Sequence, residues 1–476
     1  MPLDNPRSDF SKWYSEILLR GDIVDNRTPT KGANVLLPNG YEIWDAIKRF
    51  MDREFKKTGH KNAYFPLFIP EEFLKREAEH FSGFTPEVAW VTHVGDTPLT
   101  QKFALRPTSE TIMYHMYAQW IHSHADLPLK MNQWCNIIRW DTKETRPLLR
   151  DREFQWSEAH TAHVSYEAAA EQVKESMKIY QSLYDALCLS YLVVKRPEHD
   201  KFAGAEYTIA YDAPLPNGKV LQIGTTHHLG QNFAKPFDVK FLDKDGETKY
   251  CHQTSYGLST RLIASILSIH GDDQGLILPP MLAPTQLIVV PIIFKNKSEE
   301  VLKASKELAE KLDEWGYRAE ADLRSQYTSG WKFAEWEMRG VPLRIEIGPR
   351  DLKNNSVLTV RRDTGEKQSV AMDDLKDFIA DIFDKISKNL KKRAEATLKS
   401  LMRKADTLEE MIDIMENNRG IIQANWCGNV DCAKIVKEKI SSNILGTKYN
   451  KKEKVTGPCS ICGGEGKHRV YIASAY

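Results

Sequence analysis

Four arginines stand among apolar and aromatic residues in the segment from residue 134 to residue 163. In chain order they are Arg139, Arg146, Arg150 and Arg152. The apolar residues around Arg139 predict a strand that carries its guanidinium into a protected site. A half-buried guanidinium is costly unless it meets an anion, and its planar fork suits phosphate or carboxylate. The segment therefore predicts an anion-binding site, and a structural ion-pair network is the alternative.

Two pairs of cysteines near the end of the printed sequence have the spacing of metal ligands. Cys427 and Cys432 enclose four residues, and Cys459 and Cys462 enclose two. Four thiolates suit a tetrahedral Zn²⁺ ion and leave no open position on it, so a zinc ion held here would be structural. Four free thiols are the alternative.

Three more segments combine hydrogen-bonding side chains with glycine or with the start of an apolar helix. They span residues 106–111, 222–233 and 257–261. In the last of them, Arg261 directly precedes Leu262 and Ile263, which begin an apolar helical run.

In this order and spacing, the segments resemble the class II aminoacyl-tRNA synthetases, and in detail the prolyl-tRNA synthetases of the archaeal and eukaryotic type. The first motif of that class would end at residues 63–66, the second would centre on Arg139 and the third on Arg261. The resemblance runs from about residue 10 to residue 476. It implies that the chain attaches L-proline to tRNA(Pro) with ATP, in two steps through a prolyl-adenylate.

The resemblance also implies a role for individual residues. Arg139 would bridge the proline carboxylate and the α-phosphate, and Arg261 would hold the γ-phosphate, which makes both catalytic. The implied ATP contacts are Arg139, Asp141, Arg150, Asp151, Gln222, Thr225, Ser259 and Arg261. Gln222 would also meet Mg²⁺ through its carbonyl. The implied proline contacts are Thr108, Glu110, Arg139, Trp156, His160 and His227. Asp141 stands where the family usually has glutamate.

The chemistry of activation agrees with these residue types. A carboxylate is already ionised at neutral pH, so its attack on the α-phosphate needs no general base. The protein must instead align the reactants and neutralise phosphate charge, which arginines do well. Glu110 would pair with the ammonium of proline, because a buried cation must be paired. Residues 107–111 also look like a helix cap, and both interpretations can hold at once.

The length and the proline pattern predict how these sites are distributed over domains. A chain of 476 residues is expected to form two to four domains. Prolines at 279, 280 and 284 mark a boundary. We predict an α+β catalytic domain over residues 1–283, in which the resemblance implies the class II antiparallel sheet with flanking helices. An α/β anticodon-binding domain over 284–388 and a small zinc-binding α/β domain over 389–476 would follow.

Hydrophobic periodicity predicts the main elements. In the first domain we expect a helix over 40–57 and a strand over 62–69. In the second we expect a mostly parallel sheet with strands at 286–293, 318–323, 343–347 and 357–362. The helices predicted beside it span 298–315 and 329–338, and a third starts at 373. Residues 388–406 are predominantly basic, which favours a solvated helix face and, as a second interpretation, contact with phosphates.

Three charged residues near the end of the 343–347 strand are candidates for reading the proline anticodon. They are Arg344, Glu346 and Arg350. Arginine can pair with guanine, and a carboxylate can accept from the guanine amino edge. Ordinary surface charge on a strand is the alternative.

The remaining expectations concern partners, location and fidelity. The net charge of +1 does not indicate a nucleic-acid binder, although a local basic face would be enough. No signal peptide or membrane span is apparent, so we expect a cytoplasmic protein with no membrane partner. The resemblance implies a homodimer formed through the first motif, and a terminal Tyr476 folded back towards the active site. Only 58 residues separate His163 from Gln222, too few for a large editing domain, so alanine or cysteine would escape correction in cis.

Two rival functions remain open from the sequence. The nearest rival is a threonyl or seryl synthetase. Threonyl relatives have a catalytic zinc held by Cys and His near the amino-acid site, and no such cluster is apparent in this sequence. The other is a catalytically dead tRNA-binding relative, against which Arg139, Arg150 and Arg261 argue.

Overall fold

A computed structural model of the chain describes residues 3–80, 88–140, 142–293, 298–449, 451 and 453–476. Asp141, one of the predicted ATP contacts, lies outside the described residues.

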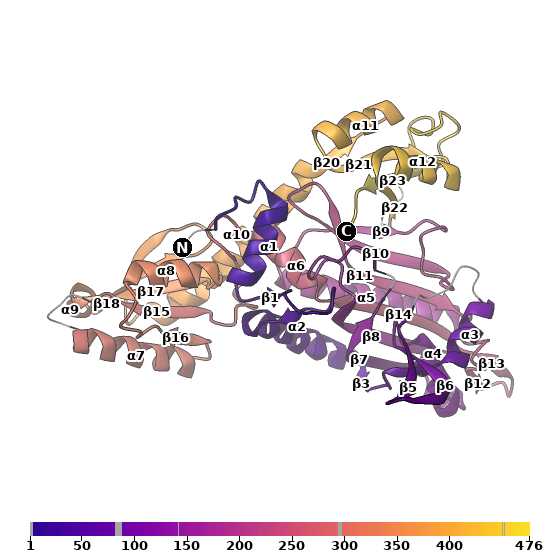
Figure 1. Cartoon of the computed structure of the whole chain (residues 1–476), viewed down its shortest axis with the longest axis horizontal. Coiled ribbons are helices and arrows are strands. Elements are labelled where there is room, and N and C mark those ends of the chain that lie inside the picture. The colour runs from indigo at the N-terminus through magenta and orange to yellow at the C-terminus, as the bar shows by residue number, and fades with distance from the viewer. Residues whose placement is uncertain (1–2, 81–87, 141, 294–297, 450, 452) are drawn as a thin grey trace.

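A largely antiparallel sheet dominates the first half of the chain (Figure 1). Its strands follow the spatial order β9-β10-β11-β14-β8-β7, and each neighbouring pair is antiparallel. The bounds are β7 Leu129–Ile138, β8 Glu153–His163, β9 Leu192–Lys195, β10 Tyr207–Pro214, β11 Val220–Gly230 and β14 His252–Ser259. The short β3 (Lys61–Asn62) adds to β7 in parallel. The predicted class II type of sheet is therefore present.

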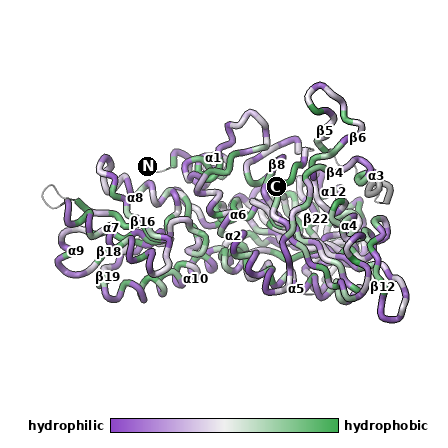
Figure 2. Tube along the Cα trace, turned by 90° about the horizontal axis from the view of Figure 1, so that it is seen from below, coloured by the Kyte–Doolittle hydropathy of each residue, from purple (hydrophilic) through white to green (hydrophobic). Residues whose placement is uncertain are grey.

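Helices of the first half pack together over this sheet. They are α1 (Phe10–Arg20), α2 (Pro38–Lys57), α5 (Tyr166–Ala186) and α6 (Arg261–His270). Both α5 and α6 contact β11 and β14, and α2 contacts both helices. Their buried faces join in one hydrophobic core that includes Trp13, Ile47 and Tyr180. Figure 2 shows hydrophobic and hydrophilic residues alternating along the helices, as expected of helices with one buried face.

The helix predicted over 40–57 is confirmed and begins two residues earlier, at Pro38. The single strand predicted over 62–69 is wrong: β3 ends at Asn62, and β4 (Phe68–Pro70) belongs to a different sheet. Pro66 lies between them and has no N–H to donate to a ladder. The buried Arg106 binds this irregular stretch, donating from Nη1 to the Phe65 carbonyl at 2.8 Å.

A smaller layer lies at one end of the large sheet. It contains a three-stranded sheet of order β4-β6-β5, and a separate pair of strands. The bounds are α3 Glu71–His80, β5 Trp90–Val94, β6 Thr97–Leu105, α4 Glu110–Trp120, β12 Lys240–Leu242 and β13 Thr248–Tyr250. Two further two-residue strands, β1 (Val24–Asp25) and β2 (Val35–Leu36), pair between α1 and α2.

The second domain has a five-stranded sheet of order β16-β15-β17-β18-β19. The bounds are β15 Leu287–Pro291, α7 Ser298–Glu314, β16 Ala319–Ala321, α8 Ser329–Met338, β17 Leu343–Ile347, α9 Pro349–Lys353, β18 Ser356–Arg361 and β19 Lys367–Ala371. The predicted order of strands and helices is confirmed. The prediction of a mostly parallel sheet is only half right, because β15 pairs in parallel with β16 and β17, whereas β17–β18 and β18–β19 are antiparallel. The links between the last three strands are too short for the crossover that parallel pairing needs.

The 27-residue helix α10 (Leu375–Leu401) connects the second domain with the rest of the chain. Its buried residues recur every three to four positions. Leu375, Ile379 and Ile382 join the core of the second domain, and Ile386 and Leu390 pack with Ile277 near the end of the first. One helical stripe therefore holds two domains together. The predicted boundary between residues 388 and 389 falls within this helix, and the three predicted domain ranges stay predictions.

The last part of the chain forms a small α/β unit. Its bounds are β20 Met402–Lys404, α11 Leu408–Asn417, β21 Ile421–Trp426, α12 Val430–Ile440, β22 Asn443–Lys448 and β23 His468–Ala473. Strand β22 pairs with β9, with Thr447 opposite Lys195, so the C-terminal strands continue the large sheet. Among the described residues, no helix is long and apolar enough to cross a membrane.

Candidate active site

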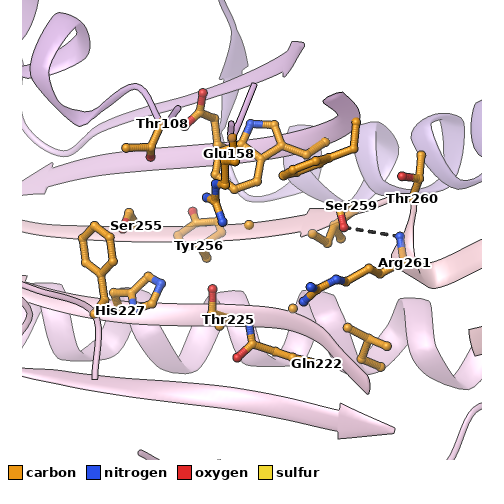
Figure 3. A pocket seen from close by; sticks show the side chains of 18 of the residues that line it. Thr108, Glu158, Gln222, Thr225, His227, Ser255, Tyr256, Ser259, Thr260 and Arg261 are labelled. Atoms are coloured by element: carbon orange, nitrogen blue, oxygen red, sulfur yellow. Dashed lines mark hydrogen bonds between the residues drawn. The ribbon is translucent and has the colours of Figure 1, made fainter. Parts of the chain in front are cut away.

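One cavity of about 420 Å³ lies on the large sheet, bordered by β8, β11 and β14 and by the first turns of α4 and α6 (Figure 3). Every predicted ATP or proline contact within the described residues lines it. They are Thr108, Glu110, Arg139, Arg150, Asp151, Trp156, His160, Gln222, Thr225, His227, Ser259 and Arg261. Residues up to about 150 positions apart in sequence thus converge on one site.

Strand alternation explains which side chains face the cavity. Trp156, Glu158 and His160 stand at every second position of β8, so they share one face. On β11, Gln222 and Thr225 are three positions apart and would face opposite sides of a regular strand. A β-bulge corrects this, because Tyr211 pairs with Gly224 and Asp212 with Gln222. The one extra residue between them turns both side chains to the cavity.

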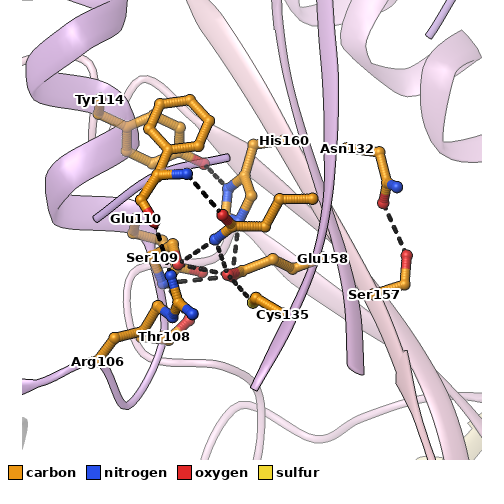
Figure 4. Close-up of polar contacts among 12 residues, drawn as sticks. Arg106, Thr108, Ser109, Glu110, Tyr114, Asn132, Cys135, Ser157, Glu158 and His160 are labelled. Carbon is orange, nitrogen blue, oxygen red and sulfur yellow. Dashed lines mark hydrogen bonds and ion pairs between the residues drawn. The ribbon is translucent and has the colours of Figure 1, made fainter. Parts of the chain in front are cut away.

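At one end of the cavity, two buried carboxylates surround a buried histidine (Figure 4). Glu158 accepts hydrogen bonds from Gln133 Nε2 at 2.7 Å, from the Ser109 amide at 3.2 Å and from the Ser109 hydroxyl. His160 Nε2 lies 3.3 Å from Glu158 Oε2, and its Nδ1 lies 2.9 Å from the Tyr114 hydroxyl. The sequence analysis missed Glu158, although its place between Trp156 and His160 on one strand face was a usable signal.

The charged groups at this end shift one another's pKa values. Burial would lower the pKa of His160, but Glu158 and Glu110 raise it above its ordinary value. Burial would raise the pKa of Glu158, but hydrogen bonds from His160, Ser109 and Gln133 lower it. Burial raises the pKa of Glu110, to whose carboxylate the Thr108 hydroxyl donates. One imidazolium between two carboxylates leaves a net negative charge, which suits a small cation.

The helix-cap interpretation of residues 107–111 is correct about where a helix begins, but no side chain caps it. Helix α4 begins at Glu110 and its N-cap is Ser109. The Thr108 hydroxyl is directed to Glu110 instead.

A second histidine of the cavity wall, His227, is uncharged. His227 Nδ1 lies 2.9 Å from the Thr208 hydroxyl, and the Phe202 ring packs on the imidazole at 4.8 Å. Burial and the neighbouring His160 lower the pKa of His227 to about 3, so this imidazole is uncharged at neutral pH. Phe202 and Thr208, which also line the cavity, were not predicted.

The other end of the cavity is cationic. The Arg139 guanidinium lies over the rings of Phe154 and Trp156, at 5.6 and 5.3 Å, and its Nε donates to the Pro107 carbonyl at 3.2 Å. Arg261 Nε donates to the Leu149 carbonyl at 2.9 Å. Burial, together with repulsion from Arg139 and Arg150, lowers the pKa of Arg261 to about 10. A polyanion placed here would relieve that repulsion.

Asp151 is the one predicted acid at this end that the structure describes. Its carboxylate accepts from the Leu148 amide at 2.8 Å and from Asn34 Nδ2 at 2.7 Å. Burial raises its pKa to about 7, and those two hydrogen bonds and the charge of Arg261 oppose the shift only in part.

Gln222 is held by an arginine that the sequence analysis did not single out. Its Oε1 accepts from Arg196 Nη2 at 3.0 Å, and the same nitrogen lies 2.8 Å from Asp212 Oδ1. An amide oxygen has a second lone pair, and Mg²⁺ prefers oxygen ligands. Gln222 therefore keeps one oxygen lone pair that suits a magnesium ion.

The four cysteines predicted as zinc ligands come together in the C-terminal unit. Their sulfur atoms all lie within 4.8 Å of one another, with Cys427 3.5 Å from Cys432 and 3.9 Å from Cys462. A tetrahedral zinc ion with Zn–S bonds of about 2.3 Å would set sulfur–sulfur separations near 3.8 Å. The cluster therefore fits zinc. Cys135, Cys188 and Cys251 are buried away from this cluster.

The anticodon candidates are partly buried in a charged cluster of the second domain. Arg344 Nε lies 3.0 Å from Glu346 Oε1, and Arg344 Nη1 lies 2.6 Å from Glu337 Oε1. The guanidinium also lies 3.9 Å from the Phe333 ring centre. Arg350, on α9, is exposed. The side chains of Arg344 and Glu346 are 9% and 11% exposed, so solvated surface charge describes only Arg350.

The C-terminal residue is anchored to the large sheet. The Tyr476 hydroxyl accepts from Asn217 Nδ2 at 2.7 Å and from Arg146 Nη1 at 3.2 Å, and Lys219 lies over its ring. The Tyr476 amide donates to the Val220 carbonyl at the start of β11. The chain end thus lies at the strand that carries Gln222.

Three family models match the chain in the order of its domains. "tRNA synthetase class II core domain (G, H, P, S and T)" matches residues 91–270, "Anticodon binding domain" matches 286–382, and "Prolyl-tRNA synthetase, C-terminal" matches 408–476.

Curated relatives match over almost the full length. A proline–tRNA ligase of Methanosarcina mazei is 46% identical over 476 aligned residues, covering 99% of this chain and 98% of that protein. Proteins of the same name from Alkaliphilus oremlandii and Pyrococcus abyssi are 45% and 44% identical, each over 98% of this chain and over 96% and 98% of their own lengths.

Proposed function

The chain belongs to the proline–tRNA ligases, class II synthetases that attach L-proline to tRNA with ATP, and from this premise we propose what each part of its cavity does. In this family the reaction has two steps: proline and ATP form prolyl-adenylate and pyrophosphate, and the tRNA then takes the prolyl group. The observation that carries the proposal is the joining of a carboxylate-rich end and an arginine-rich end in one cavity.

The carboxylate-rich end receives the amine of proline. A secondary ammonium has two N–H donors, and Glu110 and Thr108 supply two adjacent acceptors. The net negative charge around His160 offsets the charge of the buried ammonium. Trp156, His160 and His227 enclose the ring.

The arginine-rich end receives ATP. Arg139 borders both ends and bridges the proline carboxylate and the α-phosphate, and Arg261 holds the γ-phosphate. Their mutual repulsion supports this assignment, because ATP brings compensating charge. The remaining proposed ATP contacts are Asp141, Arg150, Asp151, Gln222, Thr225 and Ser259. Magnesium, which these synthetases use with ATP, shields phosphate charge when bound, and the Gln222 carbonyl is its proposed protein contact.

The cysteine cluster holds a structural zinc ion. All four ligands are thiolates, so no coordination position is left for substrate. Metal analysis of the purified chain is expected to find about one zinc per chain. Cys459→Ser should lower the zinc content and the melting temperature with little effect on the KM for proline. A full zinc content in that variant would contradict the assignment.

Arg344, Glu346 and Arg350 read the anticodon of tRNA(Pro). Arg350→Ala should raise the KM for tRNA about tenfold, the size of one charged hydrogen bond, and leave proline activation unchanged. Lys353→Ala, on the same helix, is the matched control. An equal effect of both changes would point to general phosphate attraction.

Two proposals concern the state of the protein in the cell. We place it in the cytoplasm, and we propose a homodimer formed through the first motif, which ends at residues 63–66. Sedimentation equilibrium should give twice the chain mass of 54.6 kDa. A chain that sediments as a monomer at micromolar concentration would refute the dimer.

The first experiment is ATP–pyrophosphate exchange with each of the twenty amino acids, Mg²⁺ and no tRNA. Strong exchange with proline is expected, with weaker exchange for alanine or cysteine. The absence of exchange with proline, from a folded chain, would overturn the roles proposed for the cavity residues.

A further inference from the structure

Arg196 lines the cavity beside Gln222, at the arginine-rich end proposed for ATP. We call this the nucleotide end, and the carboxylate-rich end the proline end. Arg196 contacts three parts of the chain. It directly follows β9 and is only 7% exposed. Its Nη2 donates to Asp212 Oδ1 on β10 at 2.8 Å and to Gln222 Oε1 on β11 at 3.0 Å. Its Nη1 donates to the Leu445 carbonyl on β22 at 2.9 Å. One guanidinium thus joins two strands of the large sheet to a strand of the C-terminal unit.

The backbone around Leu445 is shaped for this contact. Gly446 has a φ of +128°, and a Cβ at this position would come within 2.0 Å of the Lys195 carbonyl oxygen. Glycine therefore allows β22 to approach β9 closely enough for the Leu445 carbonyl to reach Arg196.

The charge of Arg196 is matched mainly by one buried carboxylate. Asp212 is 1% exposed, and its other oxygen, Oδ2, has no hydrogen-bond partner among the described residues. Asp200 is more distant, with its carboxylate 3.7 Å from Arg196 Nε. The paired Asp212 anchors the guanidinium in place, so that the direction of the bond to Gln222 is fixed.

We propose that Arg196 is a positioning residue for ATP, which holds the Gln222 amide in its binding orientation and is itself held by β22. This inference rests on the proposed contact between Gln222 and ATP. A glutamine amide can turn over, and a donor on its oxygen selects one of the two orientations. Arginine suits the task because its planar fork reaches several acceptors at once, whereas lysine has a single nitrogen.

The test is calorimetric titration of Arg196→Lys with ATP and Mg²⁺ in the absence of proline, which avoids any dependence on turnover. ATP affinity is expected to fall about tenfold, as for the loss of one charged hydrogen bond. Proline affinity, titrated separately, should change less than about twofold. Among the described residues, the hydrogen bonds and ion pairs of the Arg196 guanidinium go to Asp200, Asp212, Gln222 and Leu445, and the bond from the residue 196 amide to the Thr208 carbonyl is kept in the lysine variant.

Arg469→Lys is the matched control. Arg469 donates to Asn425 at 3.0 Å within the C-terminal unit and is not among the cavity residues. It should leave both affinities unchanged. Unchanged ATP affinity in Arg196→Lys, or equal losses for ATP and proline, would overturn the proposal.

Gln222→Ala separates the inference from the proposed function. If Gln222→Ala leaves ATP affinity unchanged, the ATP contact of Gln222 is wrong. If Gln222→Ala weakens ATP binding and Arg196→Lys does not, only the positioning role is wrong. When both hold, Arg196→Lys should have no further effect on ATP in the Gln222→Ala background.

Gly446→Ala tests the link to β22. The added methyl group would push β22 away from Lys195, and ATP affinity should fall while proline affinity stays the same. Circular dichroism melting is recorded first, because this change can also unfold the chain. Arg196→Lys keeps the charge and decides the positioning role by itself.

Discussion

The two ends of the cavity solve opposite electrostatic problems. At the proline end, His160 offsets only part of the charge of Glu110 and Glu158, so a net negative charge is already present in the protein. At the nucleotide end, Arg139 and Arg150 repel Arg261. A small ligand with one positive charge needs such a preformed site of opposite charge. A polyanion can instead supply the missing charge itself, so that end is complete only when ATP is bound.

Of the changes predicted, a substitution of Arg139, which borders both ends of the cavity, should reduce activity most. Arg139→Ala removes the proposed contact with both reacting groups, and kcat/KM for pyrophosphate exchange should fall about 10³-fold or more. Filter binding should show nearly unchanged affinity for tRNA. Surviving exchange activity would mean that another group contacts the α-phosphate.

Glu110→Gln tests the proline end alone. The change leaves a buried ammonium without its carboxylate, so the KM for proline should rise about 10²-fold while the KM for ATP stays nearly constant. Arg261→Gln is the counterpart at the other end and should raise the KM for ATP and spare that for proline. If both variants raise both constants equally, the two ends do not act separately.

Asp151→Asn tests the raised pKa of Asp151 at the nucleotide end in the absence of ATP. The folded-state pKa of Asp151 is about 7 against an ordinary 3.8, so between these pH values the folded chain binds more protons than the unfolded one. The stabilisation from this group is complete below pH 4 and is lost as pH rises through 7, by up to about 4 kcal/mol.

Urea unfolding of the wild-type chain and of Asp151→Asn from pH 4 to pH 8 measures this effect. The free energy of unfolding should fall with pH more steeply for the wild-type chain than for Asp151→Asn. Equal slopes would show that Asp151 titrates normally. A constant offset between the curves would reflect hydrogen bonds to the new amide and would not affect the comparison.

The smallest expected effect concerns the hydrolysis of wrongly attached amino acids. The 58 residues between His163 and Gln222 form α5, β9, β10, the start of β11 and their connections. We therefore expect no release of alanine from alanyl-tRNA(Pro) by this chain above the uncatalysed rate, followed with radiolabelled alanine. Since a pocket discriminates poorly over one or two heavy atoms, some alanine should be activated. Rapid deacylation would reveal a hydrolytic site.

Much of the active site could be predicted, because it depends on residue types at fixed spacings. The motifs around Arg139, Gln222 and Arg261 each stand on a strand end or a helix start, and the structure brings them to one cavity. The cavity residues that the sequence did not predict lie outside the motifs. Arg196 and Phe202 follow β9 in a segment without a recognisable pattern, and Glu158 was not singled out.

The fold was predicted best where hydrophobic periodicity is strong. The helix over Ser329–Met338 was predicted with its exact bounds, and Thr328 caps its first turn. Prediction failed where pairing depends on distant partners. The stretch around Pro66 is divided between two sheets, and the direction of β18 depends on a connection too short for a crossover.

The sequence by itself determined which chemical groups this protein offers, and from it we predicted their roles. Arginines for an anion and four cysteines at metal-ligand spacing follow from side-chain types and local spacing, which need no fold to be read. The role of the Thr-x-Glu pair towards an amine was implied by the resemblance to the family. Only the tertiary structure decided how the groups act together. The bulge in β11 depends on its pairing with β10. The pairing of β22 with β9 and the hydrogen bonds from Ser109 and Gln133 to Glu158 join residues far apart in the chain. Their energies depend on distance and burial, which no linear pattern contains.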